Sequence, residues 1–460
     1  MATCISRRDL MRLGALGVGG AALAACAASP APQVVKETVI VETVVTATPQ
    51  VVTGPVTIRF THVADPGELE IMQASIADFE GRNPDIHVVA ELVPEDGMDQ
   101  KITTMVAGGA APDAVYVHPS FVPLWAEQQV LIPQDDLADR DSDFGVDDFY
   151  PETVGYFVYG GKTYGFPYYS GPSVTYFNAD FFEEKGVELP TVSAEGFATD
   201  SDKWTWEKLV ELAVPLTGGE GPNRTFGYWG TPYSLHWFNV AVWSYGGQLW
   251  DEEMKQCKLS EPEAVEAIQF QVDMYTKYNI SPRPDQAEGL PGGFNSGKVG
   301  MRYGIRGNVP GFKGLEFSIG MAPIPRGPKG RFCRNGPNAA GIVSQSRFVD
   351  AAWELCKYMA GPKPGDLGGQ KYQFEQQRAI PSRASLFNTP EFQDNLLPWE
   401  SLEVYQNAAE HVKAMPLPAR YSEIQRAWRE QWDLMLLGQV SVKDGAAAAC
   451  AAIDPLLAEA

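Results

Sequence analysis

The sequence has few of the residues and motifs that mark metal or catalytic centres. Its 460 residues include only 5 histidines, scattered along the chain, and 6 cysteines, no two of which form a C-x-x-C pair. The motifs H-E-x-x-H, G-x-S-x-G and G-x-G-x-x-G are absent. These absences argue against a zinc ribbon, a metalloprotease, a serine hydrolase and a dinucleotide-binding site, so we expect neither a metal nor a cofactor.

Two further sequence features give only weak evidence for a phosphate-binding loop or a glycosidase site. Gly292 to Lys298 has the Gly-x4-Gly-Lys spacing of a phosphate-binding loop, but Val299 stands where such a loop needs Ser or Thr. No convincing buried strand precedes it. Carboxylates are numerous, yet no pair is singled out as an acid and a base, so glycosidase chemistry is only weakly indicated.

Basic residues are also scarce. The chain has 36 lysines and arginines against 58 aspartates and glutamates, for a formal net charge of −22. So acidic a protein is not expected to bind nucleic acid or an anionic lipid surface.

No apolar run is long enough to cross a bilayer, but the N-terminus has an export pattern. Arg7 and Arg8 precede a Gly/Ala/Leu/Val run from Leu13 to Ala25. That run is about a dozen residues, whereas a spanning helix needs about 20. The block from Ser6 to Arg12 resembles a twin-arginine signal, and Leu23 to Cys26 resembles a lipobox whose cysteine is lipidated. We therefore expect a signal peptide at 1–25, and a lipidated Cys26 opening a flexible tether at 26–54.

Four cysteines remain in the mature chain: Cys257, Cys333, Cys356 and Cys450. Four cysteines in an oxidising compartment allow three pairings, and buried free thiols are equally compatible with the sequence. The pairing therefore stays open.

From residue 55 onward, short apolar strands alternate with amphipathic helices. The patterns predict strands at 56–60, 86–90, 113–117 and 174–178, and helices at 66–80, 99–107, 206–216, 263–278 and 349–359. A further apolar helix face near the C-terminus carries Ile424, Trp428, Trp432 and Met435. Strand–helix–strand repetition favours parallel sheets, which bind ligands beyond the carboxyl ends of their strands.

Aromatic residues are densest between Phe226 and Trp250. Trp229, Trp237, Trp243 and Tyr245 lie there among glycines and polar residues rather than in one regular stripe. Core packing explains many such residues singly. The group, however, suits a carbohydrate site, because sugar rings stack on Trp and Tyr while their hydroxyls need polar partners.

At residues 55 to 455 the chain resembles the family 1 extracellular solute-binding proteins of ABC importers, the sugar-binding group that includes maltose-binding protein. No one stretch is specific, but several occur in the right order: Phe79–Ile86, Ala111–Val115, Tyr164–Pro167, Phe177–Asp180, Trp204–Leu209, Phe294–Met301 and Ala379–Arg383. The resemblance implies a two-lobed α/β fold of the periplasmic-binding-protein type II class, with a ligand cleft between the lobes. Lobe 1 would be 55–167 with 324–361, and lobe 2 would be 168–323 with 362–460. Three hinge crossings are expected near Tyr168, Pro323 and Gly361.

The same resemblance suggests the ligand contacts. The expected contacts are His62, Asp65, His118, Ser120, Tyr169, Gly171, Trp237, Trp243, Tyr245 and Arg306. Arg306 departs from the family pattern, since the maltose-binding relative presents a stacking tryptophan there. An arginine pairs with an anionic group or with hydroxyls, so phosphorylated, acidic and neutral ligands are all open.

The sequence therefore predicts a non-enzymatic, monomeric lipoprotein on the outer face of a bacterial membrane. It would capture a mono- or oligosaccharide and deliver it to an ABC permease, with Cys26 as its membrane anchor. The alternatives are a secreted glycan-processing enzyme, a sensor that reports ligand to a receptor, and a receptor for a polyamine, ferric iron or a glycerol phosphodiester.

Overall fold

The structure is a computed structural model that describes residues 54–63, 66–190, 203–230, 234–415 and 417–458. Residues 46–460 form one unit of the chain. Arg7, Arg8, Cys26 and Asp65 lie outside the described residues, so the expected signal peptide, lipid anchor and one expected ligand contact are not described. Among the helices within these ranges, none is long and apolar enough to cross a membrane.

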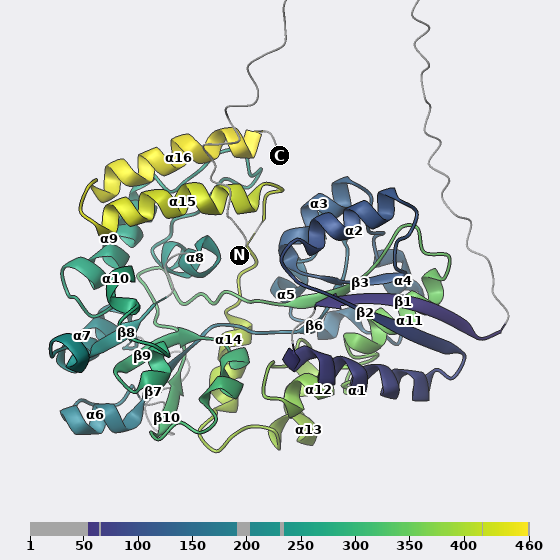
Figure 1. The fold of residues 1–460 in the computed structure, drawn as a ribbon, viewed down its shortest axis with the longest axis horizontal. Coiled ribbons are helices and arrows are strands. Elements are labelled where there is room, and N and C mark those ends of the chain that lie inside the picture. The colour runs from purple at the N-terminus through teal and green to yellow at the C-terminus, as the bar shows by residue number, and fades with distance from the viewer. Residues whose placement is uncertain (1–53, 64–65, 191–202, 231–233, 416, 459–460) are drawn as a thin grey trace, which may run out of the picture. The chain divides into compact units, whose positions relative to one another are not determined.

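The first lobe is built on a five-stranded sheet with the strand order β2-β1-β3-β11-β6 (Figure 1). Its strands are β1 (Val56–Val63), β2 (Ile86–Val93), β3 (Ala114–Val117), β6 (Phe166–Tyr169) and β11 (Asn338–Ile342). β1 pairs in parallel with β2 and β3, whereas β11 runs antiparallel to β3 and β6. Every residue of β3 is buried, as expected for a central strand covered by helices on both faces.

The helices of this lobe confirm the amphipathic patterns in the sequence. α1 (Pro66–Arg82) and α11 (Val349–Met359) lie on one face of the sheet, and α2 (Met98–Ala107) and α3 (Val122–Glu127) lie on the other (Figure 1). α11 turns Trp353, Leu355 and Met359 into the core. Short elements complete the lobe: α4 (Asp135–Arg140), α5 (Pro151–Gly155), and the hairpin of β4 (Val158–Tyr159) and β5 (Lys162–Thr163).

The second lobe is built on a four-stranded sheet with the order β10-β7-β9-β8. Its strands are β7 (Val174–Asn178), β8 (Phe226–Trp229), β9 (Val299–Gly304) and β10 (Ile319–Ala322). β7 is antiparallel to β9 and β10, and β8 is parallel to β9. α7 (Trp206–Leu216) packs so closely on this sheet that a Cβ on Gly227 would lie 2.0 Å from the Ala213 carbonyl oxygen. Only glycine fits at that position in β8.

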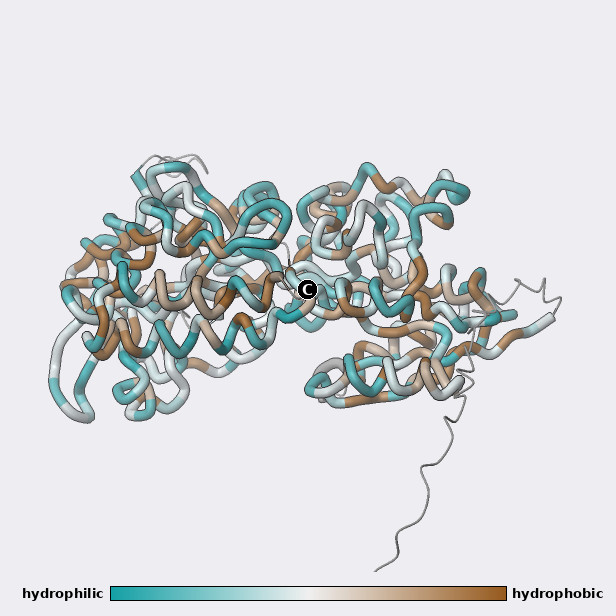
Figure 2. Tube along the Cα trace, turned by 90° about the horizontal axis from the view of Figure 1, so that it is seen from above, coloured by the Kyte–Doolittle hydropathy of each residue, from teal (hydrophilic) through white to brown (hydrophobic). Residues whose placement is uncertain are grey.

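Further helices surround the second sheet. They are α6 (Ala179–Lys185), α8 (Leu235–Ser244), α9 (Pro262–Thr276), α10 (Pro284–Ala287), α14 (Leu402–Glu410), α15 (Tyr421–Leu436) and α16 (Val442–Ala458). In α15 the expected apolar face is confirmed, because Ile424, Trp428, Trp432 and Met435 are all buried. Figure 2 shows hydrophobic and hydrophilic residues alternating along the helices, as one-sided packing requires.

The structure settles the cysteine pairing that the sequence left open. Cys257 and Cys450 form a disulfide that ties α16 to the loop before α9. Cys333 and Cys356 are buried free thiols.

The chain passes between the two sheets three times, and the third passage differs from the one expected. The first two follow β6 at Tyr169 and β10 at Ala322. After Gly361, however, the chain stays against the first lobe. Asp366 pairs with Arg82 at 3.1 Å, the Ser382 hydroxyl donates to the Pro167 carbonyl oxygen at 2.7 Å, and α12 (Gln370–Glu375) contacts α1 and β6. These contacts place residues 366–383 with the first sheet rather than the second, so the chain crosses beyond Arg383. It passes α13 (Pro390–Gln393) and reaches β7 again with α14.

Candidate ligand-binding site

Polar and aromatic side chains gather at one edge of the first sheet. β1, β2, β3 and β6 all end at this edge and the antiparallel β11 begins there, which follows from their pairing. The residues at or just beyond these strand ends are His62, Glu95, His118, Tyr169 and Asn338. This is the edge at which open α/β sheets bind their ligands.

His62 lies beneath this edge rather than on it. The side chain is 1% exposed, Nδ1 lies 3.3 Å from the Val63 carbonyl oxygen, and Nε2 lies 2.9 Å from the Tyr168 hydroxyl. Burial lowers the pKa of His62 to about 4, so the ring is neutral near pH 7. A neutral ring with its proton on Nδ1 satisfies both contacts. His62 therefore contacts Tyr168 in this conformation, and its expected contact with a ligand stays a prediction.

His118 and Ser120 form a turn at the end of β3. His118 Nδ1 lies 2.7 Å from the Ser120 hydroxyl and accepts a hydrogen bond from the Ser120 backbone N–H at 3.2 Å. The proton of the neutral ring is therefore on Nε2. Burial, with a smaller contribution from the Arg334 charge, lowers the pKa of His118 to about 4. His118 is thus a neutral donor next to Arg334.

The second sheet contributes aromatic side chains. Tyr303 lies near the end of β9, and Trp237 lies on α8. Their rings meet edge to face, with centroids 4.9 Å apart. The neighbouring His236 stacks on Tyr156 of the first lobe, with ring centroids 6.0 Å apart, so the start of α8 lies against the first lobe. The edges of the two sheets therefore share one site.

Arg334 lies at the centre of this site, in the segment between β10 and β11. Its guanidinium carbon is 4.1 Å from the centroid of the Trp237 ring, and the residue is 6% exposed. Nε donates to the Asn335 carbonyl oxygen at 3.2 Å, whereas Nη1 has no hydrogen-bond partner among the described residues. Burial lowers the pKa of Arg334, opposed by four nearby tyrosines: Tyr303, Tyr156, Tyr169 and Tyr421.

Asn335 joins the two lobes next to Arg334. Its amide Nδ2 donates to Thr153 Oγ1 at 3.0 Å and to Ser170 Oγ at 3.1 Å, and its Oδ1 accepts from Gly171 N at 2.8 Å. Its carbonyl oxygen accepts from His236 Nε2 at 3.0 Å. The fully buried Asn335 thus holds α5 and the first crossing through its side-chain amide, and α8 through its backbone carbonyl oxygen.

A second polar group sits beside Asn338 on the first sheet. The Tyr116 hydroxyl lies 2.9 Å from Asn338 Oδ1 and 3.4 Å from Glu95 Oε1. Asn338 is also paired with Tyr169 in the sheet. Donors and acceptors are therefore available next to the aromatic rings, which suits a ligand rich in hydroxyls.

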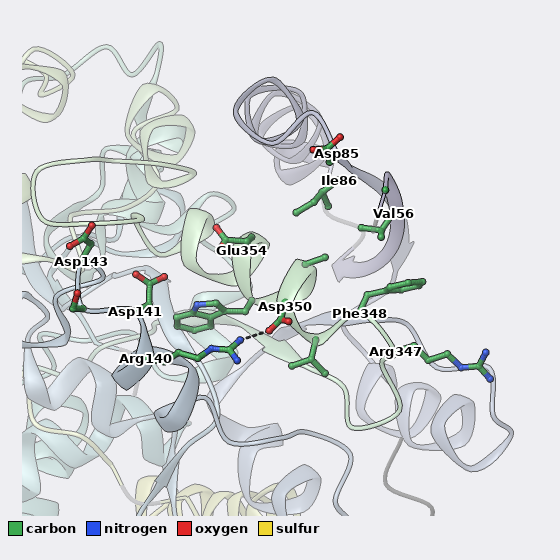
Figure 3. A pocket seen from close by; sticks show the side chains of 15 residues that line it. Val56, Asp85, Ile86, Arg140, Asp141, Asp143, Arg347, Phe348, Asp350 and Glu354 are labelled. Carbon is green, nitrogen blue, oxygen red and sulfur yellow. Dashed lines mark hydrogen bonds and ion pairs between the residues drawn. The ribbon is translucent and has the colours of Figure 1, made fainter. Parts of the chain in front are cut away.

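The hollows around this site differ from those elsewhere on the molecule. A cavity of about 20 Å³ lies beside Trp237 and Tyr303, and Trp206, Tyr228 and Gln271 also line it. A hollow of about 790 Å³ lies on the first lobe between the segments 140–143 and 347–354, where Arg140 pairs with Asp350 (Figure 3). The larger hollow contains none of the residues around Arg334, and Phe348 and Trp353 line it together with charged side chains.

The structure brings five of the expected contacts together and separates others. His118, Ser120, Tyr169, Gly171 and Trp237 surround Arg334 and Asn335. By contrast, Trp243 packs on Phe332 and Lys413. Tyr245 packs on Phe270 and lines a separate hollow beside Glu207.

The structure places Arg306 in a buried ion pair and not beside Arg334. Its side chain is fully buried, Nε pairs with Glu400 Oε1 at 2.9 Å, and its Nη groups donate to the Ala379 and Asn395 carbonyl oxygens, each at 2.8 Å. Every side of this guanidinium is occupied by the protein. In this conformation Arg306 is part of a buried ion pair, and its expected contact with a ligand stays a prediction.

Sequence reasoning missed Arg334, Asn335, His236 and Tyr303. A usable signal was present: the segment Arg331–Asn335 places two arginines in a crossing bounded by glycines and prolines, where no helix or strand pattern explains them. Among the described residues, no group of three His, Cys, Asp or Glu side chains is arranged to hold a metal ion.

The chain resembles curated binding proteins over part of their length. It is 27% identical over 296 residues to a binding protein of Brucella abortus, covering 61% of this chain and 66% of that protein. It is 26% identical over 239 residues to the mannitol-binding protein of Pseudomonas aeruginosa, covering 50% of each. It is 24% identical over 277 residues to the arabinooligosaccharide-binding protein of Halalkalibacterium halodurans, covering 59% of this chain and 54% of that one. The chain thus matches between half and two thirds of the length of these relatives.

Solved structures share the fold over most of the chain. An ABC substrate-binding protein of Listeria monocytogenes in complex with cycloalternan aligns with a TM-score of 0.74 at 21% identity, covering 88% of this chain and 99% of that one. The acarbose-binding GacH receptor of Streptomyces glaucescens aligns with a TM-score of 0.70 at 23% identity, covering 87% and 98%. These likenesses confirm the two-lobed type II fold. The family model for bacterial extracellular solute-binding proteins matches residues 64–366, and the chain therefore belongs to that family.

Proposed function

We propose that this chain is the substrate-binding component of an ABC importer and that it captures a carbohydrate between its two lobes. The observation that carries the proposal is the cluster of Trp237, Arg334 and His118, which joins the facing edges of the two sheets. Aromatic rings there suit the apolar faces of sugars, and the surrounding donors and acceptors suit their hydroxyls. The mannitol and arabinooligosaccharide relatives and the cycloalternan and acarbose complexes support a carbohydrate ligand.

Binding would require the lobes to separate and close again. The cavity of about 20 Å³ beside Trp237 has room for about one water molecule and not for a sugar ring. The hydrogen bond from His236 to Asn335 and the stacking of Arg334 on Trp237 would open to admit ligand. Hinge bending at the crossings would then close the lobes, and the ligand would favour the closed form through its additional contacts.

The N-terminal features complete the proposed route of this protein. The signal peptide at 1–25, with Arg7 and Arg8, would direct export, and lipidation of Cys26 would hold the mature chain on the outer face of the membrane. The tether at 26–54 would let the lobes reach a permease that has its own ATPase. We propose that the protein acts as a monomer and catalyses no reaction on its ligand.

Thermal denaturation of the purified protein against a saccharide panel tests this function. The panel contains hexoses, pentoses, sugar alcohols, oligosaccharides and uronic acids, with a polyamine, ferric citrate and a glycerol phosphodiester as non-sugar controls. A ligand at 100 times its Kd stabilises the folded state by about 2.7 kcal/mol, which raises the Tm by a few degrees. Chromatography of the same mixtures tests for turnover. We expect a saccharide to stabilise the protein without being converted. A rise in Tm with the non-sugar controls alone would contradict a carbohydrate ligand.

A further inference from the structure

Arg334 is a buried cation that the described protein does not neutralise. Its side chain lies against Trp237, the residue is 6% exposed, and Nη1 lacks a hydrogen-bond partner among the described residues. Moving a guanidinium out of water costs free energy unless a partner of opposite charge or several acceptors replace the lost hydration. In this conformation the acceptor found for Arg334 among the described residues is the Asn335 carbonyl oxygen.

The groups that act on Arg334 are neutral. Burial lowers the pKa of His118 to about 4 and that of His236 well below its usual value, so both rings are uncharged near pH 7. The hydroxyls that influence Arg334 belong to Tyr156, Tyr169, Tyr303 and Tyr421, and no carboxylate stands among these influences. Burial raises the pKa of Tyr156 to about 12, so it does not supply a negative charge either.

Two other buried arginines have carboxylate and carbonyl partners within the protein. Arg306 pairs with Glu400 at 2.9 Å. Arg383 lies 3.6 Å from an Asp148 carboxylate oxygen and donates to the carbonyl oxygens of Phe144, Gly145 and Gly361. The protein therefore provides carboxylate partners for Arg306 and Arg383, whereas none is found for Arg334 among the described residues.

The orientation of Arg334 also suits a ligand. The guanidinium carbon lies 4.1 Å from the centroid of the Trp237 ring and Nη1 has no partner among the described residues, so donors of the planar fork remain for the oxygens of a carboxylate or phosphate. His118 and Trp237 reach Arg334 from opposite lobes, so an oxyanion bound there would contact groups of both lobes.

We propose that the ligand is an acidic saccharide, whose oxyanion substituent binds Arg334 while its sugar ring contacts the aromatic side chains around Trp237. This inference deepens the proposed carbohydrate-binding function and rests on it. The shared chemistry is a carboxylate of a uronic acid or a phosphate ester on a sugar. Separate titrations with uronic acids and with hexose phosphates distinguish these two sources.

Isothermal titration calorimetry with matched ligands tests the inference. Galacturonate, glucuronate and their short oligomers are each compared with the methyl ester, which keeps the ring and removes the charge, and with the neutral sugar. Hexose phosphates form a separate arm. We expect at least one acidic ligand to bind about tenfold to a hundredfold more tightly than its neutral counterpart, as expected for a charge-assisted bidentate contact.

Two variants assign the preference to Arg334. Arg334→Met should abolish the difference between acid and ester, and Arg334→Lys should keep part of it because the charge remains without the planar fork. Circular dichroism and the Tm show whether each variant is folded. Arg140→Gln, which removes an exposed arginine paired with Asp350, is the matched control and should leave the difference unchanged.

The outcomes separate this inference from the proposed function. Equal affinity for acid, ester and neutral sugar would overturn the acidic-ligand inference and leave the carbohydrate receptor intact. A preference for acid that persists in Arg334→Met would overturn the assignment to Arg334. Failure of every saccharide to bind would overturn the proposed function together with the inference. Binding of the phosphate arm alone would support Arg334 as an oxyanion site and assign it to a sugar phosphate.

Discussion

Two buried arginines in this protein have opposite surroundings. Arg306 is fully buried, and Glu400 and two carbonyl oxygens engage its guanidinium, with Tyr405 and Tyr176 alongside. Arg334 is nearly as buried, yet it stacks on Trp237 among neutral histidines and tyrosines, and its Nη1 has no partner among the described residues.

The difference shows how a structural charge is told apart from a functional one. Burial by itself does not decide, because both side chains are withdrawn from water. The partner decides: a cation that the protein pairs internally serves the fold, whereas a cation left incomplete in a site between two lobes is available to a ligand. The first should matter for stability and the second for binding.

The largest effect is expected from breaking the Arg306 pair. Glu400→Gln removes the carboxylate and leaves a buried guanidinium without its counter-charge, which should lower the free energy of unfolding by about 3–5 kcal/mol. Urea denaturation measures this change. Glu403→Gln alters a nearby exposed carboxylate, at the start of α14, and should change little. Equal effects of the two substitutions would contradict a structural role for the Arg306 pair.

Acid should affect the edge of the first sheet, where the buried neutral histidines lie. The pKa of His62 is about 4 in the folded protein and about 6.5 when unfolded. Between these values the unfolded state binds more protons, so stability should fall by about 3 kcal/mol as the pH drops from 6.5 to 4. Denaturation across this range measures the loss.

Two histidine variants test the source of this pH dependence. His62→Gln should make the slope shallower because it removes the group that resists protonation. His87→Gln changes an exposed histidine beside Glu80 and serves as the control. An unchanged slope in His62→Gln would show that His62 is not the group responsible.

A substitution at Trp237 tests whether the site around Arg334 binds the ligand. Trp237→Ala removes the ring under Arg334 and a surface for stacking, so the affinity for saccharide should fall roughly tenfold to a hundredfold. Calorimetry measures the affinity. Tyr245→Phe removes a hydroxyl near Glu207, away from Arg334, and should leave binding unchanged. If Tyr245→Phe weakened binding as much as Trp237→Ala, the site would lie elsewhere on the second lobe.

The smallest effect on stability is expected at Arg334. Replacing this incompletely paired cation by Met removes its desolvation cost while keeping an apolar contact with Trp237. The free energy of unfolding of the ligand-free protein should therefore stay within about 1 kcal/mol of the wild type or rise. Urea denaturation measures it, and a loss as large as that of Glu400→Gln would show that Arg334 is structural after all.

Many helices and strands could be predicted from the sequence because they depend on local hydrophobic periodicity. The expected helices at 206–216 and 349–359 coincide with α7 and α11, and the strand near 174–178 coincides with β7. The passage after Gly361 was misplaced because nothing local reveals that Asp366 pairs with Arg82, 284 positions away along the chain. Long-range partners decide such boundaries.

The site was harder for the same reason. His118, Ser120 and Trp237 could be expected from strand ends and aromatic density. The sequence could not show that Arg306 is paired within the protein while Arg334 lacks a carboxylate partner. Glu400, which pairs with Arg306, is 94 residues distant in sequence. Whether a buried charge is paired is a property of the assembled fold, and no local pattern carries it.

The distinction between the two arginines is tested most directly by the free energy of unfolding of wild type, Arg306→Met and Arg334→Met, each measured with and without a bound saccharide. We expect Arg306→Met to lower the free energy of unfolding by about 3–5 kcal/mol without ligand and to keep the stabilisation that ligand provides. Arg334→Met should show the reverse: near-normal stability without ligand, and a smaller gain than the wild type with an acidic saccharide. If Arg334→Met unfolds as easily as Arg306→Met and still gains full stabilisation from the saccharide, the distinction between the two arginines is wrong.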